Sequence, residues 1–185
     1  IDPSTGATTK LVETTGSMTD QLLGGGTGGA TALLAFDDHV VVGLGGDTSP
    51  WAYGGLPRAL PSGTAWRLVP GQGDASLAAL GWALGAYRPR RHKAGGPAPA
   101  LLEAGEGTGQ AVMMAEAICA ARDLINAPAA DLGPAELAEA VASLAARHGG
   151  TCDVGSGQAL AQEFPPVGAV GGGRPRAPRV AVLRW

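Results

Sequence analysis

The sequence predicts an α/β fold: a small amino-terminal α/β domain over residues 31–104, then a long helix and the opening α/β units of a doubly wound domain over 105–185. Strand-like and helix-like apolar patterns alternate through the first hundred residues, which is typical of an α/β domain. After residue 107 a long helical pattern begins, and helix–strand alternation then resumes. Residues 1–30 are predicted to be a flexible, glycine-rich lead-in.

The first domain is expected to hold two strands joined by Asp37-Asp38, a short helix opened by Thr48-Ser49-Pro50, a strand, a helix capped by Asp74 and a last short strand. Their ranges are 30–36, 39–44, 51–56, 63–69, 75–87 and 99–104. The apolar face of the capped helix is predicted to be Leu77, Leu80, Leu84 and Tyr87. Gly81 and Gly85 indicate close packing, because a mid-helix glycine costs about 1 kcal/mol relative to alanine.

The second half is predicted to open with a helix over 107–127, with Ala111, Ala115, Ile118 and Ile125 on one face. A second helix begins at Pro134 and ends before Gly149, and its buried stripe is Leu137, Val141, Leu144 and His148. A short strand, a short helix, a loop and a fully buried parallel strand follow. These last elements are expected at 151–154, 157–164, 165–173 and 179–185.

Charge and composition exclude several classes of function. The formal net charge of −3 offers no electrostatic reason to expect nucleic acid or an anionic membrane as a partner. No apolar run approaches the roughly 20 residues that span a bilayer. Cys119 and Cys152 do not make a disulfide framework and are expected to be buried thiols, which favours a reducing, cytoplasmic setting.

Two stretches resemble binding motifs, and in both the plainer interpretation is favoured. Gly24, Gly26 and Gly29 satisfy G-x-G-x-x-G, but no strand precedes them and no helix follows, as a dinucleotide-binding loop requires. A flexible lead-in is therefore favoured over a phosphate site. The basic run from Arg88 to Lys93 is interpreted as a solvated helix end and linker, with nucleic-acid contact as the weaker alternative.

No catalytic or metal-binding group emerges from the residues themselves. His39, His92 and His148 lie in separate elements without metal-ligand spacing, and Asp37-Asp38 is interpreted as a turn. Ser156 is expected to cap a short helix rather than act as a nucleophile. Glu103 and Glu106 lie in a glycine-rich linker that is not expected to hold two carboxylates at a fixed separation.

The second half also carries a family resemblance. The stretches RDLINAPAADLGPAELAEAVASLAARHG and QEFPPVGAVGGGRPRAPRVAVLRW resemble the leucyl aminopeptidase family of dinuclear-metal exopeptidases, and the resemblance extends over roughly residues 31–185. Two loops depart from the family pattern. Ala127 and Ala130 stand where threonine and asparagine are usual, and Gly172-Gly173-Arg174 replaces a basic residue, a small residue and serine. These departures concern loop geometry or fine specificity.

The resemblance implies a metallo-aminopeptidase, a hydrolase that removes amino-terminal residues from peptides in the cytoplasm and assembles as a homo-oligomer, a hexamer in the family. It implies two divalent ions, zinc or manganese, whose ligands lie after the strand that ends at Trp185. No catalytic, cofactor-binding or metal residue is therefore assigned to this chain, and Asp131, Asp153 and Glu163 are not chosen. Residues 105–185 are then the linking helix and the truncated beginning of a catalytic domain, and the chain alone is expected to be inactive.

A second hypothesis remains open at this point. The chain is then a non-catalytic α/β module, derived from the family's amino-terminal region, that serves assembly or ligand binding.

Overall fold

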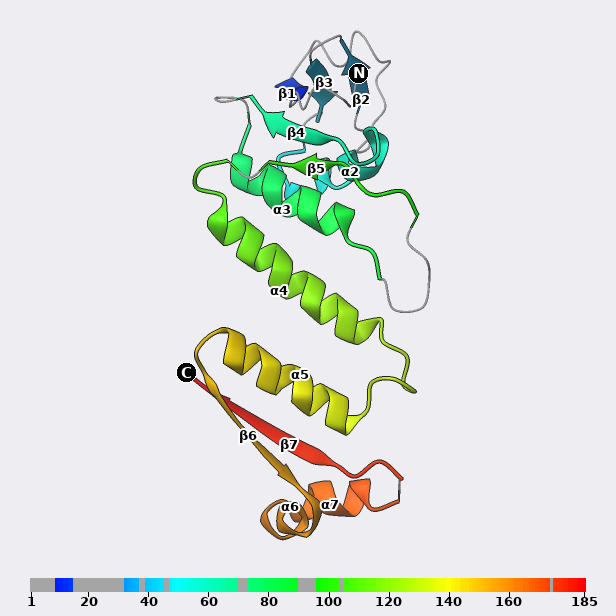
Figure 1. The fold of residues 1–185 in the computed structure, drawn as a ribbon, viewed down its shortest axis with the longest axis vertical. Helices are drawn as coiled ribbons and strands as arrows, with labels where there is room; N and C mark the ends of the chain where they lie inside the picture. The colour runs from blue at the N-terminus through cyan, green and yellow to red at the C-terminus, as the bar shows by residue number, and fades with distance from the viewer. Residues whose placement is uncertain are drawn as a thin grey trace. The chain divides into compact units, whose positions relative to one another are not determined.

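The computed structural model describes residues 9–14, 32–36, 39–44, 47–69, 73–89, 96–103, 105–173 and 175–185. The chain divides into two compact units, Ile1–Arg122 and Asp123–Trp185, each of which is described by itself. Both units combine helices with strands, so the predicted α/β fold is confirmed (Figure 1). Within the described ranges, no helix has the length and apolar character needed to cross a membrane.

The first unit is built on a five-stranded sheet in the order β2-β3-β1-β4-β5. Its strands are β1 (Thr9–Thr14), β2 (Ala32–Ala35), β3 (His39–Gly43), β4 (Ala65–Leu68) and β5 (Leu101–Leu102). Strand β1 pairs in parallel with β3 and β4, β4 pairs in parallel with β5, and only β2 is antiparallel to its neighbour. The carboxyl ends of four strands therefore meet at one edge of the sheet.

Strand β1 corrects one expectation. A flexible lead-in is predicted over 1–30, yet the segment 9–14 within it is the central strand of the sheet. The segment TKLVET carries only two adjacent aliphatic residues and no clean alternation, so its local pattern is weak. Pairing along both edges supplies the stabilisation that local propensity lacks. The three glycines of the G-x-G-x-x-G pattern lie outside the described residues.

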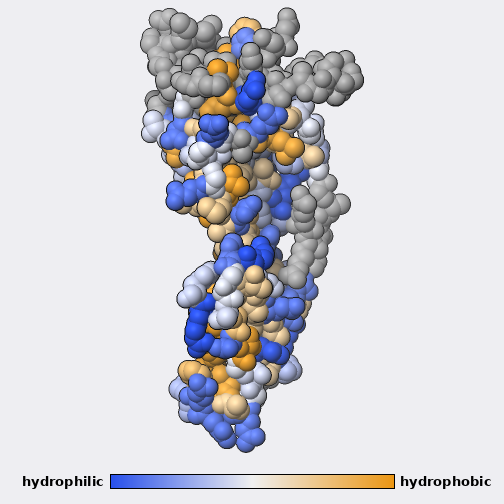
Figure 2. Space-filling model, turned by 60° about the vertical axis from the view of Figure 1, so that its left-hand side comes forward, coloured by the Kyte–Doolittle hydropathy of each residue, from blue (hydrophilic) through white to orange (hydrophobic). Residues whose placement is uncertain are grey.

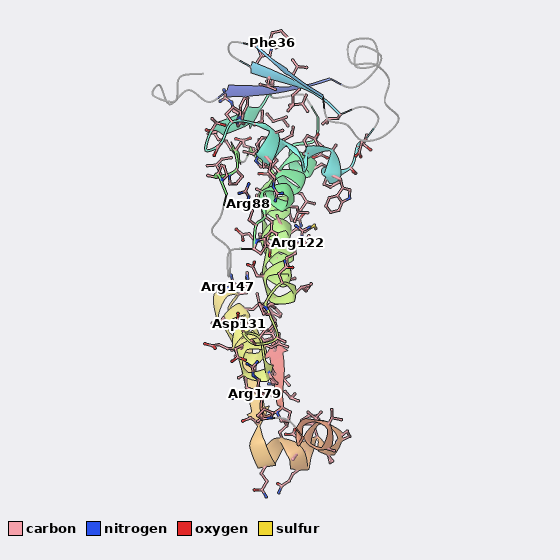
Figure 3. The ribbon with its side chains drawn as sticks, turned by 90° about the vertical axis from the view of Figure 1, so that its right-hand side faces the viewer. Phe36, Arg88, Arg122, Asp131, Arg147 and Arg179 are labelled. Carbon is pink, nitrogen blue, oxygen red and sulfur yellow. The ribbon has the colours of Figure 1, made fainter. Side chains whose placement is uncertain are left out.

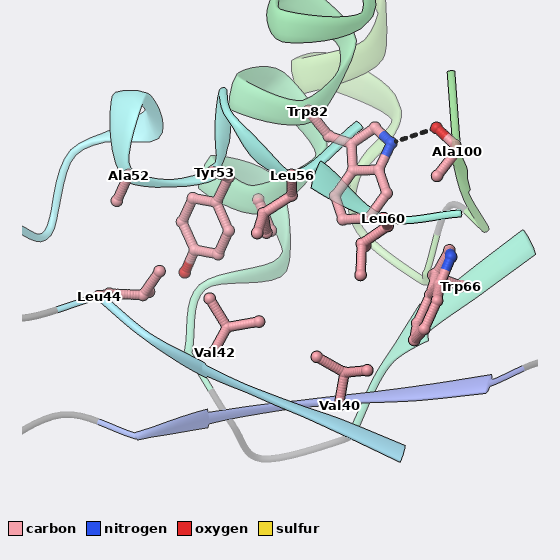
Figure 4. Close-up of a cluster of buried hydrophobic side chains, with 11 residues drawn as sticks. Val40, Val42, Leu44, Ala52, Tyr53, Leu56, Leu60, Trp66, Trp82 and Ala100 are labelled. Carbon is pink, nitrogen blue, oxygen red and sulfur yellow. Dashed lines mark hydrogen bonds between the residues drawn. The ribbon is translucent and has the colours of Figure 1, made fainter. Parts of the chain in front are cut away.

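The core of this unit lies on one side of the sheet, beneath η1 (Pro50–Tyr53), α2 (Leu56–Ala59) and α3 (Ala75–Ala86) (Figure 4). Trp66 of β4 is fully buried, and the indole Nε1 of Trp82 donates a hydrogen bond of 2.8 Å to the carbonyl oxygen of Ala100. The buried apolar members of the cluster are Val40, Val42, Leu44, Ala52, Tyr53, Leu56, Leu60, Trp66, Ala78, Trp82 and Ala100.

Helix α3 begins as predicted and buries a different face. Asp74 caps it, its Oδ1 accepting from the backbone N–H groups of Ser76 at 2.8 Å and Leu77 at 3.1 Å. Of the predicted face only Leu84 is buried, with 7% of its surface exposed. The other buried residues are Ala78, Ala79, Gly81 and Trp82, because elements pack around more than one side of the helix and no single stripe is left.

The two glycines of α3 lie against backbone, which confirms the predicted close packing. A Cβ built on Gly81 would lie 1.8 Å from the carbonyl oxygen of Pro50, and one built on Gly85 would lie 1.9 Å from that of Gly54. Only glycine permits this approach of a helix to a neighbouring backbone.

Helix α4 (Gly109–Ile125) confirms the long predicted helix. Ala111 and Ala115 are buried as expected, Ile118 is half-buried, and Ile125 is 81% exposed. The buried residues of α4 are both alanines, so the helix packs through small side chains, which permit a close approach to neighbouring elements. Among the described residues nothing covers Ile125.

The second unit contains α5 (Pro134–Arg147), β6 (Thr151–Ser156), α6 (Gly157–Glu163), α7 (Pro165–Gly171) and β7 (Arg179–Arg184). The predicted helix start and stop of α5 are confirmed, with Pro134 in the first turn and Gly149 at a φ of +73° beyond its end. The buried residues of α5 are Ala138 and Ala145, whereas Leu137 of the predicted stripe is 47% exposed.

Two further expectations for this unit are wrong. The segment predicted as a loop forms α7, because two prolines at its start fit the first helical turn, where no N–H partner is needed. Strand β7 is antiparallel to β6, since the short α6–α7 connection returns the chain from one end of β6. It is only half-buried rather than fully buried, because within the described residues its one strand neighbour is β6.

Candidate functional site

The histidines that sequence reasoning considered occupy separate structural positions. The ring of His39 stacks on Phe36, with centroids 4.6 Å apart and planes 9° from parallel; Phe36 follows β2 (Figure 3). His148 ends α5, and its carbonyl oxygen accepts from the indole Nε1 of Trp185 at 3.3 Å. His92 and the Asp37-Asp38 pair lie outside the described residues. No group of three or more His, Cys, Asp or Glu side chains in the described ranges could hold a metal ion.

The remaining acids and nucleophiles of the second half also do not converge. Asp153 forms an exposed ion pair with Arg184 across the β6–β7 ladder. Ser156 occupies the cap position of α6, but its side chain makes no capping hydrogen bond. Cys119 in α4 and Cys152 in β6 are half-buried and belong to different units. Asp131 follows α4 in the turn before α5, and Glu163 ends α6, so neither lies in the same element as the other acids.

Two arginines donate hydrogen bonds to carbonyl oxygens at the carboxyl end of α3, and neither belongs to the basic run from Arg88 to Lys93. Arg122 Nη1 donates to the carbonyl oxygen of Leu84 at 3.1 Å, and its guanidinium lies 5.5 Å from the ring centroid of Tyr87 (Figure 3). Arg58 Nη2 donates to the carbonyl oxygen of Tyr87 at 3.1 Å. Positive charge at a helix carboxyl end is favourable. Arg88 is half-buried, and residues 90–95 lie outside the described ranges.

An arginine also fixes the first loop that departs from the family pattern. Arg176 donates to the carbonyl oxygens of Ala129 and Ala130. The pKa of Glu136 is lowered by hydrogen bonds from its own backbone N–H and from that of Gly133, the latter at 2.8 Å, with a further contribution from the positive charges of Arg176 and Arg179. Hydrogen bonds and charge interactions of Arg176 and Glu136 therefore connect this loop with the start of α5. Arg174 of the second departing loop lies outside the described residues.

A cavity of about 350 Å³ lies at the carboxyl ends of β4 and β5, and the sequence interpretation missed it. Glu103 and Glu106, which the sequence places in a glycine-rich linker, both line this cavity. Ligands bind preferentially at the carboxyl edge of parallel strands. The parallel pairing of β4 with β5 could therefore have indicated this cavity, but β5 has only two residues and gives a weak strand pattern in the sequence. The other lining residues are Arg67, Leu68, Val69, Gly73, Ala75, Ala78, Ala79, Leu102, Gly105 and Thr108.

The walls of this cavity are apolar and its polar groups are few. Alanines of α3 form one side, and Leu68 and Leu102 contribute from the two strands. Thr108 is only 3% exposed, and its Oγ1 donates to the carbonyl oxygen of Gly105 at 2.7 Å. Arg67 and the two glutamates are exposed. An apolar cavity with a small number of polar groups is the usual form of a small-molecule site.

Figure 2 shows apolar side chains among polar ones on the surface. Among the described residues of the first unit, the large exposed apolar ones are Phe36, Trp51, Leu101, Met113 and Met114. Singly scattered apolar residues of this kind are common on protein surfaces.

Comparison with known proteins gives the family. A family model described as the M17 aminopeptidase N-terminal domain matches residues 3–103. The crystal structure of a cytosol aminopeptidase from Coxiella burnetii matches 96% of this chain with a TM-score of 0.80 and 26% identity, and the matched part is 44% of that protein. The bottromycin maturation enzyme BotP, in complex with Mn, matches 96% of the chain and 45% of its own length, with a TM-score of 0.73 and 26% identity.

Other matches are more distant. A leucyl aminopeptidase from Trypanosoma cruzi is 18% identical, with a TM-score of 0.66 over 97% of this chain and 45% of its own, and it supports the fold alone. No curated protein sequence gives a significant match. The chain thus spans less than half the length of the solved structures it resembles. Since the family model covers more than half of its residues, the chain belongs to the M17 aminopeptidase family, whose N-terminal domain it contains.

Proposed function

We propose that this chain is part of a leucyl-aminopeptidase-like metallo-exopeptidase, which removes amino-terminal residues from peptides by dinuclear-metal hydrolysis. The observation that carries the proposal is the M17 N-terminal match over residues 3–103, together with a fold match to a cytosol aminopeptidase over 96% of the chain. The proposed partners are peptide substrates and further copies of the same subunit, in the cytoplasm, with no role for nucleic acid or membrane.

The proposed enzyme uses two divalent ions, zinc or manganese, and a structure of BotP contains manganese. The described residues of this chain do not fit such a centre, because they bring together no three side chains of the required types. No catalytic step is therefore assigned to them. We infer that the ligands and catalytic groups lie outside residues 1–185, which agrees with the 44% of the Coxiella burnetii enzyme that the chain matches.

Under this proposal the residues present here have a scaffolding role. The sheet of the first unit and the helices η1, α2 and α3 on its core side share one hydrophobic core. Helix α4 begins in the first unit, and its last residues, from Asp123 onward, belong to the second.

The test compares two samples. The first sample is the polypeptide that contains this sequence, purified from the cells that produce it. It should release p-nitroaniline from leucine p-nitroanilide when Mn²⁺ or Zn²⁺ is added, and it should lose that activity when EDTA is added. The 185-residue chain alone should be inactive under the same conditions. Metal-dependent turnover by the 185-residue chain, or metal-independent turnover by the isolated polypeptide, would contradict the proposal.

A second candidate function is a non-catalytic module for ligand binding or assembly, and the cavity at the ends of β4 and β5 favours it. The same assay separates the two candidates. Absence of peptidase activity in the polypeptide isolated from its own cells, whatever its length, would favour the module.

A further inference from the structure

The cavity at the carboxyl ends of β4 and β5 is lined mainly by apolar side chains, and this lining limits the kind of ligand that it can hold. We infer that the cavity binds a small, uncharged aliphatic compound, of which a straight-chain alcohol is the simplest example. Its volume of about 350 Å³ is near the lower end of small-molecule sites, which suits a compound of that size. The inference gives a ligand class to the second candidate function and is independent of the peptidase proposal, because the described lining residues all belong to the first unit.

The buried part of the lining consists largely of methyl and methylene groups. Ala78 and Ala79 of α3 are 0% and 6% exposed, and Ala75 in the first turn is half-buried. Leu68 of β4 and Leu102 of β5 are half-buried and line the cavity from the strands. Cavities with walls of this kind take up apolar molecules, because a buried water needs several polar partners that such walls do not supply. An aliphatic ligand would remove its own apolar surface and that of the walls from water, which is favourable.

The buried polar side chain of the lining already donates its hydrogen within the protein. Among the described lining residues this side chain is Thr108, which is 3% exposed, and its Oγ1 donates to the carbonyl oxygen of Gly105 at 2.7 Å. A hydroxyl has a single hydrogen, so this group cannot also donate to an anion. The described lining therefore offers no buried side-chain donor that would hold an anionic ligand.

The charged side chains of the lining do not select a charged ligand either. Arg67, Glu103 and Glu106 carry charges of both signs and are all exposed, so solvent screens their attraction for an ion. None of the charged side chains in the described lining is buried. A charge that a ligand carried into the cavity would lose its hydration without meeting a buried counter-charge, which is costly. This cost applies to cations and anions alike and favours an uncharged compound.

The first test is a titration of the 185-residue chain with 1-butanol, 1-pentanol and 1-hexanol, followed through amide chemical shifts. All three alcohols should bind saturably and shift the amides of Ala78, Ala79 and Leu102. The affinity should rise about fourfold with each added methylene group, which is the usual effect of burying one such group. Shifts that do not saturate, or equal affinities for the three alcohols, would overturn the inference.

Two ions with the same kind of aliphatic body test the preference for an uncharged ligand. Hexylammonium and hexanoate should both bind at least about tenfold more weakly than 1-hexanol, because their charges must be desolvated at the cavity. Binding of either ion as tight as that of 1-hexanol would overturn the inference. Neither result bears on the peptidase proposal, which the leucine p-nitroanilide assay tests separately.

Variants separate this cavity from general surface binding. Ala75→Leu fills the cavity from the first turn of α3 and should abolish 1-hexanol binding, whereas the matched control Ala120→Leu, at an exposed position of α4, should leave it unchanged. Ala75→Val adds a smaller side chain at the same place and should weaken binding at least about fourfold. It provides the test if circular dichroism shows that Ala75→Leu has lost helix. Undiminished binding in a folded Ala75 variant, or an equal loss in Ala120→Leu, would overturn the inference.

Discussion

Replacing Gly81 or Gly85 with alanine should destabilise the first unit by about 2 kcal/mol, although alanine is the better helix former. A Cβ at Gly81 would lie 1.8 Å from the carbonyl oxygen of Pro50, and contacts under 3.0 Å are essentially never seen, so α3 and η1 must separate by the difference, at least 1.2 Å. The atom in the way belongs to backbone, and no side chain can rotate aside. Separation also disturbs Tyr53, a member of the core. Overpacking costs about 1–3 kcal/mol, and we take the upper end, about 3 kcal/mol, because the clash is with backbone; subtracting about 1 kcal/mol gained in helix propensity leaves about 2 kcal/mol.

The assay is urea unfolding followed by tryptophan fluorescence, which reports on the buried Trp66 and Trp82. Gly109→Ala is the matched control, because Gly109 begins α4 and a Cβ there meets nothing within 4 Å. The control should be neutral or slightly stabilising. If Gly81→Ala and Gly85→Ala unfold at the same urea concentration as Gly109→Ala, the close approach of α3 to η1 is refuted.

Three smaller predictions concern single polar contacts. Asp74→Ala should cost about 1 kcal/mol in the urea unfolding of the first unit, because it removes the side-chain cap of α3. Arg122→Met should cost a similar amount, about 1 kcal/mol, because the carbonyl oxygen of Leu84 loses a charged donor and the ring of Tyr87 loses its cation; an unchanged unfolding midpoint would show that these contacts do not form. The pKa of Glu136 is lowered in the folded chain, so its stabilising effect is present above the unfolded value of 4.5 and is lost as the pH falls below it. The difference in thermal unfolding between the native chain and Glu136→Gln should therefore be larger at pH 7 than at pH 3, and a difference of the same size at both pH values would contradict this account.

Elements whose starts and ends are marked by capping or turn residues could be predicted from the sequence. Asp74 before α3, Pro134 and Gly149 around α5, and the hairpin strands β2 and β3 all carry their signals within a few residues. Strand β1 could not be found this way, because its stability comes from two neighbours that are distant in sequence. The direction of β7 depends likewise on where its connection returns the chain, which the apolar run of the strand does not encode.

The buried faces of the helices were predicted less well, for one physical reason. Leucine spacing suggested single stripes, whereas the buried residues of α4 and α5 are alanines, and α3 buries alanines and Gly81 beside Trp82 and Leu84. The cavity was missed for a related reason. Glu103 and Glu106 are near one another in a glycine-rich stretch, and only the pairing of β5 with β4 gives that stretch a fixed place beside α3.

The two units differ in how much apolar surface they bury, and a difference in stability should follow. Large side chains such as Trp66, Leu56 and Val42 are fully buried in the first unit. Among the described residues of the second unit, the buried apolar residues are Ala138, Ala145 and Leu160, while Leu137, Val154 and Val182 are 47%, 40% and 39% exposed.

Domains of about 60 residues are marginal even with a full core, so the second unit should open more readily than the first. Hydrogen exchange on the 185-residue chain measures this directly. Amides of α5 and of the β6–β7 ladder should exchange at least about tenfold faster than those in the middle of α3, since each 1.4 kcal/mol of opening free energy is a factor of ten. Equal protection in the two units would mean that the exposed valines and leucine of the second unit are covered in solution, by self-association or by a rearrangement of its sheet. Sedimentation of the same sample would distinguish these two causes, because only self-association raises the mass above that of one chain.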